Sequence, residues 1–75
     1  MPDEIDVDAR GLLCPLPVLR LARALRRAPA GTVAVLRATD LAAERDVEAY
    51  CRDSGQAMLS CEREGALLTI RVRRA

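Results

Sequence analysis

The sequence predicts an α/β two-layer sandwich, in which a four-stranded mixed sheet carries two helices on one face. Two observations lead to this fold. Along the 75 residues, the spacing of apolar residues switches between the two-residue period of strands and the 3.6-residue period of helices. Glycines, prolines and the candidate helix cap at Thr39 or Asp40 divide the chain into six segments in the order β-α-β-α-β-β. Packing both helices on one side of the sheet covers the apolar face of every segment, and the first crossover should be right-handed.

The first two segments are predicted to be a strand and a helix. In EIDVDA, apolar Ile5 and Val7 alternate with aspartates, which is typical of a strand, and Gly11 ends it. From Pro15 onward, apolar residues recur at helical spacing until the sequence APAG ends the helix. The apolar stripe consists of Val18, Leu21, Ala22 and Leu25, and the opposite face carries Arg20, Arg23, Arg26 and Arg27.

The next strand and helix follow the same logic. Residues 32–38 are β-branched or apolar at nearly every position and are predicted to form a central, buried strand. Thr39 or Asp40 can cap the helix that follows, and Gly55 can end it. The apolar face of this helix consists of Ala43, Val47, Tyr50 and Cys51.

The last part of the sequence predicts a hairpin. Residues 56–62 suit a third strand, although the pattern does not decide which face is buried, and Gly65 marks the turn. Leu68, Ile70 and Val72 then alternate with polar residues, which indicates a half-buried fourth strand.

Composition limits the possible functions. A chain of 75 residues is expected to form one domain over residues 1–75, and it buries only about 60% of its unfolded surface, so chemistry has to occur near the surface. Tyr50 is the only aromatic residue, which argues against stacking on nucleic-acid bases. The net charge of +1 gives no electrostatic reason for bulk nucleic-acid or membrane binding. Without histidine, hydrolysis by a Cys–His pair within this chain is excluded.

The cysteines and the first residues indicate the compartment. Three cysteines are an odd number, which argues against a disulfide framework. The acidic, polar start MPDEIDVDAR lacks the apolar region of a signal peptide, and no apolar run approaches the ~20 residues of a membrane span. We therefore expect a cytoplasmic protein.

Cys14 is the candidate for chemistry. Pro15 and Pro17 suit the first turn of a helix, where an amide N–H has no partner within the helix, and they stiffen the junction. The thiol would then lie in solvent at the positive end of the helix dipole, which predicts a moderately lowered thiol pKa, and Arg10 could add positive charge. A lone thiolate can exchange disulfides, bind a metal with a partner, or carry a group on sulfur.

The other two cysteines are expected to be structural. Cys51 lies on the apolar face of the second predicted helix, and Cys61 lies in a predicted strand. Free cysteines in such positions usually serve as small core residues.

Two stretches resemble a known family. The stretch DARGLLCPLP, from Asp8 to Pro17, resembles the signature of the TusA/SirA-like sulfur carrier family, a Cys-Pro-x-Pro motif preceded by an Asp-x-x-Gly-Leu-type stretch. ATDLAAERDVEAYCRDSG is similar to the family's second segment, an acidic turn followed by a helix with Arg-Asp, an aromatic residue and a cysteine. Element order and length match as well, so the resemblance covers essentially the whole chain. Leu41 departs from it, since family members commonly have proline there.

The resemblance implies a sulfurtransferase that acts as a sulfur carrier. Cys14 would accept sulfane sulfur as a persulfide from a donor protein, such as a cysteine desulfurase or a rhodanese-type enzyme, and pass it to an acceptor protein. tRNA thiolation, molybdenum-cofactor sulfur supply and sulfur oxidation are known uses in the family. No cofactor, metal, membrane or direct nucleic-acid partner is expected.

The candidate supporting residues surround Cys14 in the sequence. Asp8 could hydrogen-bond the loop, and Arg10 could guide an acidic partner or stabilise the persulfide. Asp40 and Asp46 match the family's second segment and are expected to have a structural role at a helix start. The supporting set is Pro15, Pro17, Arg10, Asp8 and Gly11.

Two other functions stay open at this point. A non-catalytic RNA- or protein-binding module could use the open sheet face and the basic end RVRRA, and it predicts that Cys14→Ser keeps its function. A thiol redox switch would pair Cys14 with Cys51 or Cys61, although the sequence has no C-x-x-C motif.

Overall fold

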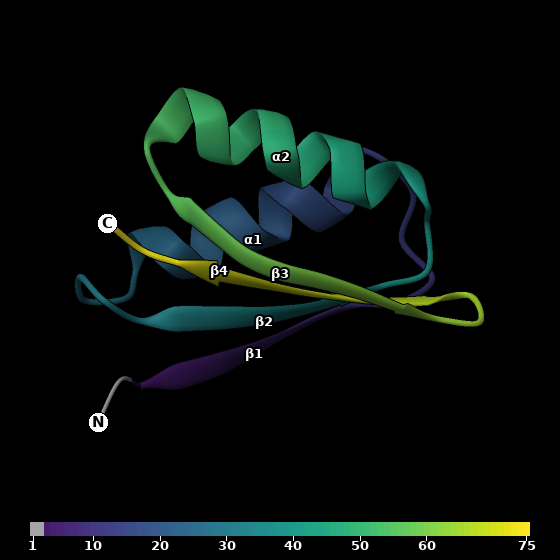
Figure 1. The fold of residues 1–75 in the computed structure, drawn as a ribbon, viewed down its shortest axis with the longest axis horizontal. Coiled ribbons are helices and arrows are strands. Elements are labelled where there is room, and N and C mark those ends of the chain that lie inside the picture. The colour runs from purple at the N-terminus through teal and green to yellow at the C-terminus, as the bar shows by residue number, and fades with distance from the viewer. Residues whose placement is uncertain (1–2) are drawn as a thin grey trace.

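The computed structural model describes residues 3–75, which form the six predicted elements in the predicted order (Figure 1). The four strands form one sheet, and both helices lie on the same side of it. The predicted fold class is confirmed. The strands are β1 (Glu4–Ala9), β2 (Val33–Ala38), β3 (Ala57–Glu64) and β4 (Leu67–Arg73), and the helices are α1 (Leu16–Arg26) and α2 (Ala42–Ser54).

The strand order β1-β2-β4-β3 makes the first two strands neighbours. β1 and β2 pair in parallel, from Glu4 opposite Val33 to Ala9 opposite Ala38. The pairs β2–β4 and β3–β4 are antiparallel, so the sheet is mixed. Because β1 and β2 run in the same direction, the loops that follow them leave the same end of the sheet, on the right in Figure 1.

The two prolines after Cys14 occupy different positions at the start of α1. Pro15 is the N-cap, and its carbonyl accepts a hydrogen bond from the N–H of Leu19 at 3.2 Å. The prediction that Pro15 is the first helical residue was therefore wrong by one position. Pro17 lies within the first turn, as predicted, and its ring is fully buried.

Helix α2 ends where the sequence predicted. Gly55 has a φ of 80°, in the left-handed region that suits glycine at a helix end, and its N–H donates to the carbonyl of Cys51 at 2.9 Å. Within residues 3–75, no helix is long and apolar enough to cross a membrane.

The core lies between the sheet and the helices. Helix α2 contributes its whole predicted apolar face, and α1 contributes Val18, Leu21 and Leu25 of its predicted stripe, with Ala24 in place of Ala22. The strands contribute every second side chain. Central strand β2 is buried on both faces, because Val35 on the face away from the helices is only 3% exposed. The largest fully buried side chains are Leu21, Leu25, Leu36, Leu68, Ile70, Val47, Val72 and Pro17.

The sheet face away from the helices is covered by charged side chains of the chain itself. Val35 pairs with Asp6 on β1 and with Arg71 on β4, so the three side chains share this face. Arg37 Nη1 lies 3.1 Å from Asp6 Oδ1, and Arg71 Nη1 lies 3.1 Å from a Glu62 carboxylate oxygen. Such exposed ion pairs stabilise a fold by only about 0–1 kcal/mol each. Their effect here is to cover apolar surface that the helices do not reach.

We predict that Leu21→Ala lowers the free energy of unfolding by about 2–5 kcal/mol, because it leaves a cavity in a fully buried position. Urea unfolding followed by circular dichroism measures the loss. Leu19→Ala is the matched control on the same helix, since Leu19 is 56% exposed, and should change stability by less than about 0.5 kcal/mol. Equal losses in both variants would show that the core has been assigned to the wrong face of α1.

Candidate functional site

The loop that carries Cys14 is held by the segment that follows β2. Gly11 has a φ of 78°, a left-handed conformation that other residues rarely adopt, and its N–H donates to Thr39 Oγ1 at 2.8 Å. The N–H of Cys14 donates to Asp40 Oδ2 at 2.8 Å. Asp40 Oδ1 accepts a second hydrogen bond, from the N–H of Ala42 at 3.0 Å. One carboxylate therefore ties the Cys14 loop to the start of α2.

The thiol of Cys14 also contacts α2. Its Sγ donates to Asp46 Oδ2 at 2.6 Å. Cys14 is exposed, whereas Cys51 is buried and Cys61 is half-buried, and all three are free thiols. Cys14 is therefore the thiol that an approaching protein can reach.

The surroundings of Cys14 raise the pKa of its thiol. The hydrogen bond to Asp46 is the largest cause, followed by partial desolvation and by the negative charges of Asp46 and Asp40, while Arg45 acts in the opposite direction. The predicted lowering of the pKa was therefore wrong. The start of α1 offers few hydrogen-bond donors that could stabilise a Cys14 thiolate. Its two prolines lack an N–H, and the N–H of Leu16 donates to the carbonyl of Leu13 at 2.9 Å.

Asp8 and Arg10 bind one another at the end of β1. The Arg10 guanidinium donates to Asp8 through Nε at 2.9 Å and through Nη2 at 3.0 Å, and the Arg10 N–H donates at 3.1 Å. These hydrogen bonds lower the pKa of Asp8 to about 2. Arg20 Nη1 donates to the backbone carbonyl of Asp8 at 3.0 Å. Arg10 is thus paired with a carboxylate, and its suggested action on a persulfide stays a prediction.

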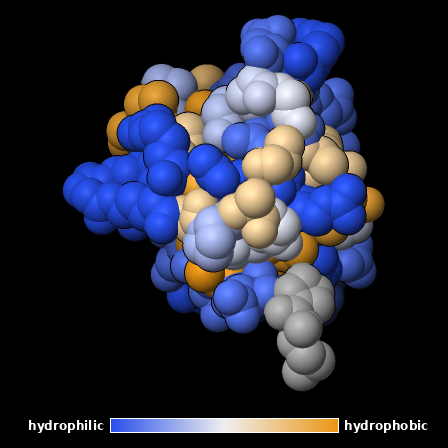
Figure 2. Space-filling view, turned by 90° about the vertical axis from the view of Figure 1, so that its left-hand side faces the viewer, coloured by the Kyte–Doolittle hydropathy of each residue, from blue (hydrophilic) through white to orange (hydrophobic). Residues whose placement is uncertain are grey.

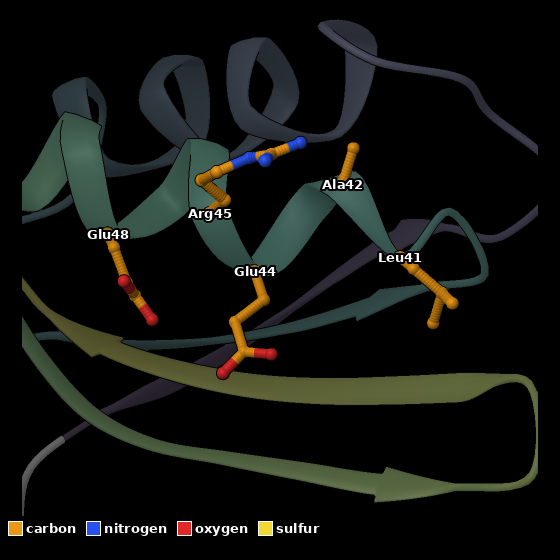
Figure 3. Close-up of a pocket in the computed structure, with 5 residues that line it drawn as sticks. All are labelled: Leu41, Ala42, Glu44, Arg45 and Glu48. Carbon is orange, nitrogen blue, oxygen red and sulfur yellow. The ribbon is translucent and has the colours of Figure 1, made fainter.

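Arg45 supplies the positive charge that favours a Cys14 thiolate. It lines a shallow pocket of about 480 Å³ on α2 (Figure 3). In this view Glu44 and Glu48 point toward the strands, whereas the Arg45 side chain extends toward the amino-terminal end of the helix. Among residues 3–75, no group of three or more His, Cys, Asp or Glu side chains is placed to hold a metal ion.

Exposed apolar side chains lie on the loop that carries Cys14 and on the segment that binds this loop. Leu13 is 71% exposed, Leu16 is 48% exposed, and Leu41, which follows the carboxylate that binds the Cys14 N–H, is 53% exposed. We call Leu13, Leu16 and Leu41 the apolar rim. The opposite end of the molecule is mainly hydrophilic, with small apolar areas between charged side chains (Figure 2). A cluster of large apolar side chains at one end of so small a protein is typical of a protein-binding surface.

Sequence reasoning missed part of this site. Asp40 and Asp46 were assigned only a structural role, and Thr39 was considered only as a helix cap. The available signal was topological: when β1 and β2 are parallel neighbours, the loops after both strands lie together at the carboxyl ends of the strands, where sites in such sheets usually form.

Comparison with known proteins identifies the family. The family model described as sulfurtransferase TusA matches residues 5–74. The chain belongs to the TusA family. It is 35% identical over 60 residues to the sulfur carrier protein TusA of Allochromatium vinosum, a match that covers 80% of this chain and 79% of that protein. It is 33% identical over 73 residues to TusA of Pseudomonas putida, covering 97% and 90% of the two chains.

One further relative agrees with this assignment, and one solved structure shares the fold. A Neisseria meningitidis protein described as a candidate sulfur carrier is 39% identical over 64 residues, covering 85% of this chain and 86% of that protein. The crystal structure of a SirA-like protein from Desulfitobacterium hafniense superposes with a TM-score of 0.78 at 22% identity, covering 91% of this chain and 93% of that one. This structure supports the TusA-family fold.

We predict that alkylation of Cys14 by iodoacetamide has its pH midpoint above the ordinary thiol value of about 8.5, because neighbouring carboxylates disfavour the thiolate. Arg45→Gln should raise this midpoint further, since it removes the cation that favours the thiolate. Peptide-level mass spectrometry across a pH series measures the midpoint for Cys14 alone.

Arg10→Gln is the matched control for Arg45→Gln. The Arg10 guanidinium is engaged by Asp8, so its removal should leave the midpoint of Cys14 unchanged. A shift with Arg10→Gln and none with Arg45→Gln would mean that the two arginines have been given the wrong roles.

Proposed function

We propose that this TusA-family protein is a persulfide-relay sulfurtransferase. Cys14 accepts sulfane sulfur from the persulfide of a donor protein, such as a cysteine desulfurase or a rhodanese-type enzyme, and delivers it to an acceptor protein. The observation that carries the proposal is the position of Cys14: it is an exposed thiol, held by its own N–H at the end of a small sheet, while Cys51 is buried and Cys61 is half-buried.

The chemistry is thiol–persulfide exchange. In loading, Cys14 Sγ attacks the terminal sulfur of the donor persulfide, the S–S bond of the donor breaks, and the donor cysteine leaves with the electron pair. In delivery the roles are reversed, and Cys14 is the leaving group. The sulfur atom moves without an external oxidant or reductant.

The apolar rim is the proposed contact surface for both partners. A carrier has to present the same sulfur atom to a donor and then to an acceptor, so both proteins must cover the surface next to Cys14. Leu13, Leu16 and Leu41 lie there and are about half exposed or more. Covering them with a partner removes apolar surface from water, which favours binding. The final destination of the sulfur, whether tRNA thiolation, molybdenum-cofactor sulfuration or sulfur oxidation, depends on which acceptor fits this surface.

The first test of the relay is the mass of the carrier. After incubation with a cysteine desulfurase and cysteine, the wild-type protein should gain the mass of one sulfur atom, which a reductant removes. Cys14→Ser should gain none, because it lacks the acceptor thiol. Cys61→Ser is the matched control and should load normally, since Cys61 is half-buried in β3. Loading of Cys14→Ser, or failure of the wild type with both a desulfurase and a rhodanese-type donor, would contradict the proposal.

The second test addresses the apolar rim. Leu13→Ser should weaken productive binding of the donor about fivefold to tenfold, because truncation of an interface anchor costs more than about 1 kcal/mol. The donor concentration that gives half-maximal loading rate measures this loss, and alkylation of Cys14 by iodoacetamide should not change. Leu59→Ser is the control, since Leu59 is also an exposed leucine but lies at the bulge of β3. Equal effects of the two substitutions would show that the rim has no special role.

A further inference from the structure

We propose that Asp46 is the proton acceptor of Cys14 in this reaction. Its carboxylate takes the S–H proton as Sγ attacks the donor persulfide, and it supplies a proton to Sγ when Cys14 later leaves. The inference rests on the proposed sulfur relay and assigns to α2 a residue that acts directly on the reacting atom.

The hydrogen bonds around Cys14 leave one carboxylate oxygen for this role. Asp46 Oδ2 lies 2.6 Å from Sγ and accepts the thiol proton. Asp40 is the other acid that acts on the thiol, but its two oxygens accept the N–H groups of Cys14 and Ala42. Arg45 is the cation that acts on the thiol, and it carries no basic lone pair at neutral pH. The chain has no histidine that could replace a carboxylate as base.

The proton and the electron pairs balance in each step. During loading, the S–H bond of Cys14 breaks and the proton goes to Asp46 Oδ2, while a new S–S bond forms between Sγ and the sulfane sulfur. The S–S bond of the donor breaks, and its electron pair leaves on the donor cysteine. Asp46 then gives its proton to that thiolate or to water. In delivery the acceptor thiol gives its proton to Asp46 as its sulfur attacks the sulfane sulfur. The S–S bond to Sγ breaks, its electron pair leaves on Sγ, and Asp46 passes that proton to departing Sγ.

The contact also determines where the transferred sulfur can lie. At 2.6 Å, Sγ and Oδ2 are in hydrogen-bond contact, with no room for another atom between them. A sulfane sulfur bonded to Sγ must therefore lie on another side of Sγ from Asp46. Cys14 is exposed, so a partner can reach the sulfur on a side that Asp46 does not occupy.

A shared proton gives a characteristic pH profile. The reactive pair holds one proton between Sγ and Oδ2. A general base that takes the proton during the attack does not require a free thiolate to form first. Loading through Asp46 should therefore change little between about pH 6 and pH 8, whereas attack by a free thiolate should accelerate about tenfold per pH unit below the thiol pKa. Single-turnover loading of the wild-type carrier from glutathione persulfide distinguishes these two mechanisms. The pH dependence of the glutathione persulfide itself is measured separately, and the loading rates are corrected for it.

Asp46→Asn provides the decisive comparison, because it keeps the size of the side chain and removes its charge. Without the carboxylate, the Cys14 thiol should ionise more easily and react faster with iodoacetamide at pH 7. Sulfur loading at the same pH should nevertheless fall by about 100-fold, the usual contribution of a general base. Asp46→Glu should recover part of the loading rate. Asp53→Asn is the matched control on the last turn of α2, where Asp53 is exposed and next to Arg52, and it should change neither rate.

Each alternative result overturns the inference in a recognisable way. If Asp46→Asn loads sulfur as fast as the wild type or faster, Asp46 only holds the resting thiol and accepts no proton. If its alkylation rate is unchanged, the contact with Sγ does not exist in solution. If Asp46→Asn fails to fold, a wild-type loading rate that rises tenfold per pH unit still rejects the role. If the wild type takes no sulfur at all, the relay itself fails, whereas a failure of Asp46→Asn alone to behave as expected leaves the relay intact.

Discussion

The parallel pairing of β1 with β2 is the constraint on which the site depends. It places Ala9 opposite Ala38, so the loop after β1 and the segment after β2 leave the sheet side by side. Gly11 can then donate to Thr39, and Cys14 to Asp40. A parallel pair also requires a crossover, here through α1, whose amino end has to lie near the end of β1. One topological choice therefore fixes both the helix end that carries Cys14 and the acidic segment that faces it.

The charges at this end of the sheet decide the protonation state of Cys14. A helix amino end carries roughly half an elementary charge, and this effect falls off within a turn. Asp46 carries a full negative charge and accepts the thiol proton directly, and Asp40 adds a second carboxylate. Arg45 compensates only in part, so the thiol form is favoured. The result is an exposed cysteine that is protected, when unloaded, from the reactions that require a thiolate.

The sequence predicted the elements well because each of them has a clear period and a clear end. Leu21 and Leu25 follow helical spacing, Ile70 and Val72 follow strand spacing, and Gly55 ends α2. At the candidate site, the sequence singled out Cys14 and its local neighbours but not the groups of α2 that contact the thiol. The period of α2 shows that Asp46 is near a helix start, but it gives no information on which loop lies opposite. That contact arises between residues 32 positions apart, and only the strand order brings them together.

The same separation explains why the electrostatic prediction failed while the motif was identified correctly. Cys-Pro-x-Pro specifies local geometry, since proline fixes φ and removes donors at the start of α1. The pKa of Cys14 is instead determined by groups from α2 and the segment before it, which no local motif contains. These groups also connect docking to chemistry. A partner that docks on Leu13, Leu16 and Leu41 would contact the loop of Cys14 and the segment that begins α2 together. The groups that hold Cys14 would then lie within the same interface as the sulfur.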